Sequence, residues 1–173
     1  EPYRLYVAHI LRTEVDSTMN IRSHPQAIIM GDFNDYPTNQ SILKILKAEA
    51  PPVKTNDLAS TTDSANASTV TPSSLKLYHL LARKAKSKNF GSYKFRGEWG
   101  LLDHLIVSGT LLNQSNHFFT SEEKANVCLL PFLLKDDEKY GDKEPFRTYK
   151  GMKYQGGISD HLPIYTDFEL IVY

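Results

Sequence analysis

The sequence predicts an α/β fold, because segments with the apolar spacing of helices alternate with short apolar runs of strand length. The chain has 173 residues, of which 40% are hydrophobic, enough for one ordinary globular domain with its own core. Its apolar runs are far shorter than the roughly 20 residues of a membrane-spanning helix. Twenty basic and twenty acidic side chains cancel, so bulk charge does not point to long nucleic acid as a partner.

The first part of the chain predicts a helix, a strand and a second helix. Apolar residues recur every three or four positions over 4–20, which is the spacing of one helix face and indicates a surface helix. The apolar run at 26–33 has the length of a buried strand. Helical spacing returns at 41–48, and Thr38 or Asn39 is the expected N-cap.

The middle of the chain predicts a long loop, a short helix and then strands. Residues 51–74 are dominated by Ser, Thr, Ala, Asn and Pro, which is typical of a loop. We expect a short helix at 75–85. Aromatic and basic residues alternate over 93–96, and aromatic and glycine residues follow, so the simplest prediction is two strands joined near Gly97. A further strand is expected through 101–107.

The last part predicts two more strands on either side of a polar segment. The apolar run at 125–134 is the first strand, and the period-two alternation of 161–173 indicates the second, with Pro163 at its start, where the missing N–H does least harm. Residues 135–157 are polar, mixed in charge and long enough to carry a function. The single cysteine, Cys128, excludes an internal disulfide, and its apolar neighbours indicate a buried thiol.

The motif "GDFNDYP" places polar side chains at the end of the first predicted strand. Because successive side chains of a strand face opposite ways, Phe33 can enter the core while Asp32 and Asn34 share the other side. A carboxylate beside a neutral amide can orient an attacking water and donate a hydrogen bond to a phosphate oxygen. The alternative is an Asp-Asn turn that closes a βα unit.

Two Asp-His pairs, in "LLDHLIVS" and "GISDHLPI", stand at the starts of apolar strands. His161 could stabilise or protonate a phosphate, and Asp103 could hold its imidazole in one tautomer. Asp160 would then be free to bind a hard cation such as Mg²⁺. The alternative for either pair is a strand cap with a surface histidine, and we favour that interpretation for His104.

Taken together, "GDFNDYP", "GEWGLLDHLIVS" and "SDHLPI", in that order and with those apolar flanks, resemble the C-terminal half of the endonuclease/exonuclease/phosphatase family, the deoxyribonuclease-I-like metal-dependent phosphoesterases. The resemblance covers nearly the whole chain. It implies an α/β fold, classed as α+β in some schemes, that is part of a four-layer sandwich of two mixed β-sheets flanked by helices. It also implies hydrolysis of a phosphodiester or phosphate monoester by activated water, with Mg²⁺ or Mn²⁺ as cofactor.

The resemblance further implies a role for each matching residue. Asp32 matches the carboxylate that activates or positions the water, and Asn34 matches the amide that holds the water and the phosphate. His161 matches the histidine at the scissile phosphate. Asp103 matches the carboxylate that orients this histidine, and Asp160 matches the acidic residue beside the metal. Which of Asp32 and His161 takes the proton stays open.

Other residues are weaker candidates for substrate binding. Tyr93, Arg96 and Trp99 precede the strand of Asp103 and could edge a cleft, although an aromatic hairpin packed on its own core is the alternative. Basic residues of the polar segment could meet a phosphate or sugar, but their acidic neighbours favour a solvated loop of mixed charge. These basic residues are Lys139, Arg147, Lys150 and Lys153.

The resemblance also implies a metal-binding Glu, a nearby Asn and an Asn-His stretch in the first half of the family domain, and no match to them occurs here. We therefore expect residues 1–173 to be the C-terminal portion of one such domain, without its N-terminal half and inactive alone. Half a sandwich exposes apolar sheet faces, so we expect either self-association or coverage by the missing N-terminal segment.

The alternative function is a non-catalytic interaction module that retains the fold. The substrate class stays open among nucleic acid, a phospholipid head group and a small phosphate ester. Localisation, whether cytoplasmic or exported, also stays open, because any targeting signal would lie upstream of residue 1.

Overall fold

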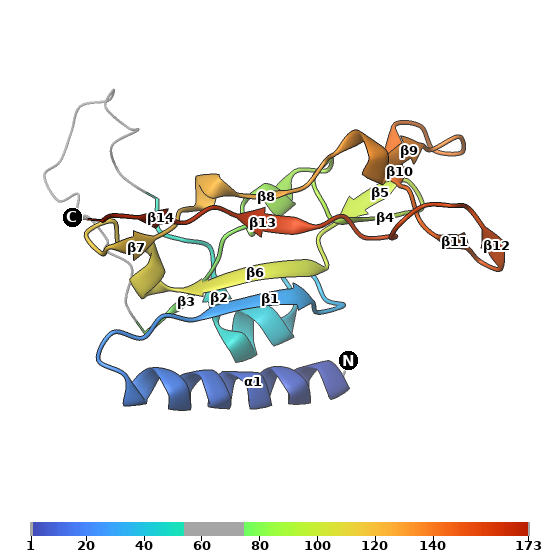
Figure 1. Ribbon diagram of the computed structural model, residues 1–173. Coiled ribbons are helices and arrows are strands. Elements are labelled where there is room, and N and C mark those ends of the chain that lie inside the picture. Colours follow the sequence, from blue (N-terminus) through green and yellow to red (C-terminus); the bar gives the residue numbers. More distant parts are fainter. Residues whose placement is uncertain (1, 54–74, 173) are drawn as a thin grey trace, which may run out of the picture.

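The computed structural model describes residues 2–53 and 75–172. A long helix covers one face of a four-stranded sheet, and short strands, among them β8 and β13, lie over the other face (Figure 1). The fold is therefore mixed α/β, as the sequence predicts. Most of the expected loop at 51–74 lies outside the described residues.

The main sheet has the strand order β1-β6-β3-β2. Strand β6 is antiparallel to both β1 and β3, while β2 is parallel to β3. Strand β1 is therefore an edge strand of the described sheet, and β6 is a central one. The four strands are β1 (Ile28–Asp32), β2 (Ala48–Glu49), β3 (Leu77–His79) and β6 (Asp103–Ser108).

The other described strands form antiparallel pairs. These pairs are β4 (Tyr93–Phe95) with β5 (Glu98–Gly100), β7 (Phe118–Phe119) with β14 (Glu169–Leu170), β8 (Ala125–Val127) with β13 (Ile164–Thr166), β9 (Leu134–Asp136) with β10 (Lys143–Pro145), and β11 (Tyr149–Lys150) with β12 (Lys153–Tyr154).

One long helix and several short helical turns complete the described chain. The turns are η1, which is π-helical (Ser41–Leu46), and the 3₁₀ turns η3 (Lys84–Lys86), η4 (Gly109–Leu112), η5 (Glu122–Lys124) and η6 (Pro131–Leu133). The long helix is α1 (Pro2–Ile21). No helix in the described ranges is long and apolar enough to cross a membrane.

Several predicted elements are confirmed. The helix at 4–20 is α1, and the strand at 26–33 is β1. The expected burial of this strand is wrong, because β1 lies at the edge of the sheet and is largely exposed. The two strands joined near Gly97 are β4 and β5, and Gly97 has φ +88°, a conformation that glycine adopts at little cost. The strand through 101–107 is β6.

The predicted helix at 75–85 is wrong. Residues 77–79 form strand β3, and a 3₁₀ turn follows only at Lys84. All five side chains from Leu77 to Leu81 are buried, because the segment lies between two layers. Such a short, continuously apolar run fits a buried strand as well as a helix, so periodicity alone could not separate the two.

Other predictions are right in kind but not in extent. The helix at 41–48 is the π-helical turn η1, and neither Thr38 nor Asn39 caps it, because Gln40 precedes it without a side-chain cap. The strand at 125–134 is interrupted by η6, the one at 161–173 divides into β13 and β14, and hairpins occupy much of 135–157. Cys128 is half-buried rather than buried.

Two apolar clusters hold the layers together. The first lies between α1 and the main sheet and includes Ala8, Leu46, Leu77 and Ile106. The second lies between the main sheet and the short strands and is formed by Leu80, Leu81, Leu101, Leu105, Val107, Leu111, Ala125, Val127 and Leu162. Central strand β6 contributes to both clusters, so it is covered on both faces.

The second layer does not reach edge strand β1. Met30 pairs with Leu105 and Ile28 pairs with Val107, so each pair shares one face of the sheet. Leu105 and Val107 are buried, yet Met30 is 57% exposed and Ile28 is 47% exposed. An apolar strip therefore remains open along the edge.

Candidate functional site

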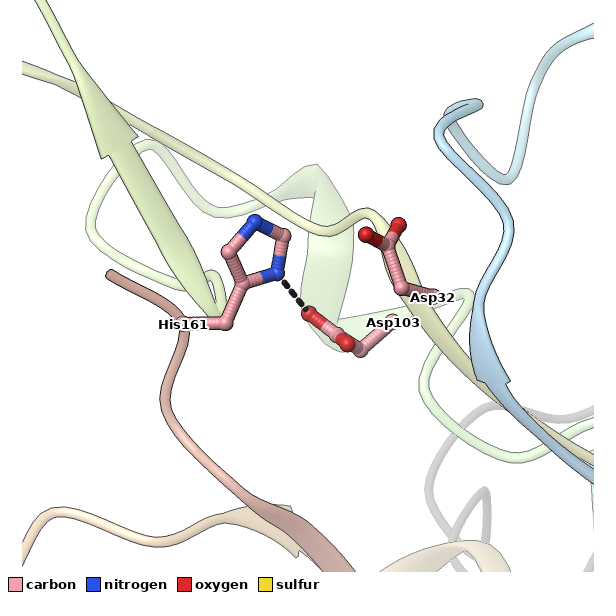
Figure 2. Close-up of side chains that lie close together, drawn as sticks. All are labelled: Asp32, Asp103 and His161. Atoms are coloured by element: carbon pink, nitrogen blue, oxygen red, sulfur yellow. Dashed lines mark hydrogen bonds and ion pairs between the residues drawn. The ribbon is translucent and has the colours of Figure 1, made fainter. Parts of the chain in front are cut away.

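Asp32, Asp103 and His161 meet at one end of the main sheet (Figure 2). Asp32 ends β1, Asp103 begins β6, and the two are paired across the strands. Residues directly opposite each other in an antiparallel pair share a face, so both carboxylates project toward the second layer. This is the layer from which His161 approaches.

Strand β4 holds the segment that carries His161. His161 forms an isolated antiparallel bridge with Tyr93, and the Leu162 N–H donates to the Ser92 carbonyl over 2.7 Å. The rings of Tyr93 and His161 lie 4.8 Å apart. Backbone and ring contacts together therefore fix where the imidazole stands.

Asp103 orients the imidazole of His161. The His161 Nδ1 lies 2.7 Å from Asp103 Oδ2, and both side chains are partly buried. Ser92 Oγ donates to the same carboxylate oxygen. With Nδ1 directed at the carboxylate, Nε2 is the nitrogen that stays available, and Figure 2 shows it on the side of the ring away from Asp103.

Asp32 brings a second, exposed carboxylate to this place. Its Oδ1 accepts the backbone N–H of Asn34 over 2.8 Å, and Asn34 has φ +54°, a conformation that Asn tolerates better than most residues. The Asp-Asn turn that the sequence offered as an alternative is thus present. It does not exclude a site, because ligand atoms of Asp32, Asp103 and His161 all lie within 4.8 Å of one another.

The remaining predicted residues are placed differently. Asp160 is exposed and is not part of the described cluster of three convergent groups. Tyr93 lies against His161. Trp99 packs beside the second apolar cluster, and Arg96 stands in the turn between β4 and β5. Of the three weaker candidates, Tyr93 is the one that contacts the site.

The prediction of a surface position for His104 is wrong. His104 and His79 are both fully buried, and His104 Nδ1 lies 2.6 Å from His79 Nε2. The Leu81 N–H donates to His79 Nδ1 over 3.1 Å, and His104 Nε2 donates to the Asp35 carbonyl over 2.8 Å. A backbone N–H can only donate and a carbonyl can only accept, so both tautomers are fixed and both rings are neutral.

Burial sets the protonation of this histidine pair. Desolvation, followed by the neighbouring His104, lowers the pKa of His79 to about 3. Desolvation also lowers the pKa of His104, although the Asp35 carbonyl opposes the shift. The pair ties β3 to the backbone carbonyl of Asp35, the residue after Asn34, so it supports the turn that carries the predicted site residues.

Asp35 is a buried residue of the site region to which the sequence analysis gave no role. Its carboxylate accepts hydrogen bonds from Ser41 Oγ and Asn39 Nδ2, each over 2.6 Å, and pairs with Arg4 Nε at 3.0 Å. Desolvation alone would raise the pKa of Asp35, but the bonds from Ser41, Asn39 and Arg4 outweigh it and lower the pKa. The sequence signal that could have indicated this role is an Asp a few positions before Asn39 and Ser41, at the start of a helical pattern.

Comparison with known proteins bears on this site. The model of the endonuclease/exonuclease/phosphatase family matches residues 1–170. The chain belongs to this family. No curated protein and no solved structure matches it significantly. Family members generally hydrolyse phosphoester bonds and typically depend on a divalent metal.

The donor set fits the kind of cation that this family uses. Mg²⁺ and Mn²⁺ prefer oxygen ligands, and Mg²⁺ is usually held by one or two carboxylates together with water and substrate oxygens. Asp32 and Asp103 offer carboxylate oxygens within the cluster, whereas His161 Nδ1 is already bonded to Asp103. The two carboxylates can thus bind an oxygen-ligated cation, and His161 can contact a phosphate at the same place.

Proposed function

We propose that the chain carries the catalytic end of a metal-dependent phosphoesterase, which hydrolyses a phosphodiester or phosphate monoester with an activated water. The observation that carries the proposal is the 2.7 Å bond between Asp103 and His161, two residues 58 positions apart in the chain. The exposed carboxylate of Asp32 stands beside this bond. Membership of a family that acts on phosphoesters adds independent support.

The roles follow from the hydrogen bonds. Asp103 binds Nδ1 of His161 and fixes the orientation of the imidazole, so that Nε2 is the nitrogen that can exchange a proton with a phosphate oxygen or with the leaving group. Asp32 is an exposed acceptor that can orient the attacking water. The side-chain amide of Asn34, beside Asp32 in the turn, can donate to the phosphate without adding negative charge.

Asp32 and Asp103 would hold Mg²⁺ or Mn²⁺. Asp160 is a further candidate ligand, supported by the sequence but not by the described cluster. When bound, the ion supplies positive charge that offsets the negative charge developing on the phosphate. Asp103 can serve the ion through Oδ1, because the bonds from Ser92 and His161 both go to Oδ2.

The test is hydrolysis of a substrate panel by the chain joined at its N-terminus to the first half of a family domain. The panel holds bis(p-nitrophenyl) phosphate, p-nitrophenyl phosphate, single-stranded and double-stranded oligonucleotides and a phospholipid, each with Mg²⁺ or with EDTA. Asp103→Asn and His161→Gln should each lower kcat by at least about 100-fold, the usual contribution of a positioned acid or base.

Matched variants serve as controls. Asp136→Asn changes an exposed carboxylate that pairs with Lys143 on β10, and His24→Gln changes an exposed histidine beside Ser23. Both should keep the activity of the unchanged protein. Turnover that survives Asp103→Asn and His161→Gln would show that the chemistry lies elsewhere.

A further inference from the structure

A second concave site lies where the turn between β4 and β5 meets the segment between β9 and β10. Its volume is about 260 Å³. Five of its lining residues are basic and two are acidic, so the pocket carries a positive excess. Phe95 and Tyr140 supply aromatic surface beside these charges.

Both acidic residues of the pocket are already paired with lysines. Lys94 Nζ lies 3.2 Å from Asp137 Oδ2, and each of these side chains is only 3% exposed. Glu144 lies 3.5 Å from Lys135 and 3.5 Å from Lys150. The negative charges that line the pocket are therefore compensated before any ligand arrives.

Three cations of the pocket have no such compensation. Within the described ranges, no carboxylate pairs with Arg96, Lys139 or Arg147. Arg147 donates through NH2 to the Lys94 carbonyl over 3.3 Å, and its buried Nε has no hydrogen-bond partner. A guanidinium with a buried, unpaired donor is suited to binding an oxyanion, because charge-assisted hydrogen bonds are stronger than hydrogen bonds between neutral groups.

The floor of the pocket is fixed by the fold. Lys94 Nζ donates to the Gly141 carbonyl over 2.8 Å, and the N–H groups of Lys139 and Tyr140 both donate to Asp137 Oδ1. A Cβ on Gly97 would lie 2.9 Å from the Cβ of Tyr140, so the turn packs directly on that side chain. Hydrogen bonds and packing therefore hold the floor of the pocket in place.

The pocket and the candidate active site are linked along β4. Tyr93 lies against His161, and its ring stacks on Phe95, which lines the pocket, with 6.4 Å between centroids. At about 3.3 Å per strand residue, Phe95 stands roughly 7 Å along β4 from Tyr93. One small molecule can span this distance.

We propose that this pocket binds a second phosphate group of the substrate, away from the one that is cleaved. The uncompensated cations Arg96, Lys139 and Arg147 supply the attraction, and Phe95 and Tyr140 flank the organic part. The volume is smaller than that of sites for drug-sized ligands, which favours a single phosphate on a small group. The proposal rests on the proposed function for the identity of the ligand as substrate.

The first test is binding of inorganic phosphate to the chain, followed by nuclear magnetic resonance of backbone amides. Phosphate should shift the signals of pocket residues such as Arg96 and Lys139. The double variant Lys139→Gln/Arg147→Gln should weaken this binding at least about tenfold, as expected for the loss of charge-assisted bonds. The control Lys86→Gln/Lys88→Gln removes the same charge from exposed lysines outside the pocket and should leave the affinity unchanged.

The second test separates free phosphate from a substrate phosphate. Fructose 1,6-bisphosphate should bind at least about tenfold more tightly than fructose 6-phosphate, and either Lys139→Gln/Arg147→Gln or His161→Gln should remove this advantage. His161→Gln should leave the pocket shifts caused by inorganic phosphate in place. Neither test requires turnover, so a failure of the proposed activity would not affect the first.

Three results would overturn the proposal. Pocket signals that do not move with phosphate would exclude an anion site there. If Lys139→Gln/Arg147→Gln and Lys86→Gln/Lys88→Gln weaken phosphate binding equally, the loss of affinity reflects the net charge of the protein and not the pocket. Phosphate binding in the pocket without a preference for the bisphosphate would exclude a substrate phosphate as its ligand.

Discussion

His79 and His104 show how one buried contact can support a site in which neither residue has a proposed chemical role. His104 donates to the carbonyl of Asp35, the residue after Asn34, and His79 fixes the tautomer of His104. Every polar atom of the two rings has a partner, which is what makes a buried polar pair tolerable. Loss of either ring would leave the other with an unpaired, buried nitrogen.

Acid should destabilise the protein through His79. In the folded protein its pKa is about 3, whereas in the unfolded chain it takes up a proton near pH 6.5. Between these values the unfolded state binds more protons, so the free energy of unfolding should fall as pH decreases, by up to about 1.4 kcal/mol per pH unit from this group. Urea unfolding at pH 7, 6, 5 and 4 measures the slope.

The variant His79→Gln isolates this effect, because Gln retains a donor for His104 but does not titrate. Its free energy of unfolding should depend less on pH between pH 6 and pH 4. Unfolding curves that respond to pH identically in both proteins would show that His79 does not titrate over this range.

Among the elements, edge strand β1 combines site residue Asp32 with an open apolar strip. Met30 and Ile28 are exposed although their partners on β6 are buried, and the outer edge of the strand has no described neighbour. Edge strands with apolar faces readily pair with other chains. We propose that a second copy of the chain covers this edge when the chain is alone.

Met30→Lys should reduce this association, because a charge on an edge strand opposes pairing. The free energy of unfolding should change by no more than about 0.5 kcal/mol, as for most surface substitutions. Sedimentation over a range of concentrations measures the effect. Met152→Lys, at a fully exposed position in the turn between β11 and β12, is the control, and equal association of both variants would place the contact elsewhere.

At the scale of the whole molecule, the described cluster offers two carboxylates to a cation, and the Glu implied by the family resemblance has no match. Mg²⁺ prefers six ligands, so we expect weak binding to the chain alone and little hydrolysis. Joining the chain to the first half of a family domain should strengthen Mg²⁺ binding and restore turnover. Titration calorimetry with Mg²⁺ and parallel assays measure both, and equal results for the two proteins would contradict the expectation.

Local patterns in the sequence were sufficient for part of this description. Helix α1, strand β1 and the β4–β5 hairpin follow from apolar periodicity and from a glycine at a turn, which are properties of neighbouring residues. The motifs around Asp32, Asp103 and His161 identified the family and predicted residues that do come together. Chemistry carried by short contiguous motifs is visible without the fold.

Tertiary structure decided the rest, because burial and convergence depend on which segments pack together. Two covering layers made residues 77–79 a strand and buried His104, although the residue types of "LLDH" fit a surface histidine equally well. The register of β1 against β6 set Asp32 opposite Asp103, and a one-residue slip would have turned one carboxylate to the other face. The charge of the pocket between the β4–β5 turn and the β9–β10 segment also depends on tertiary structure. Asp137 pairs with Lys94 of β4, whereas no carboxylate of the described residues pairs with Arg96, Lys139 or Arg147, an outcome that composition alone does not determine.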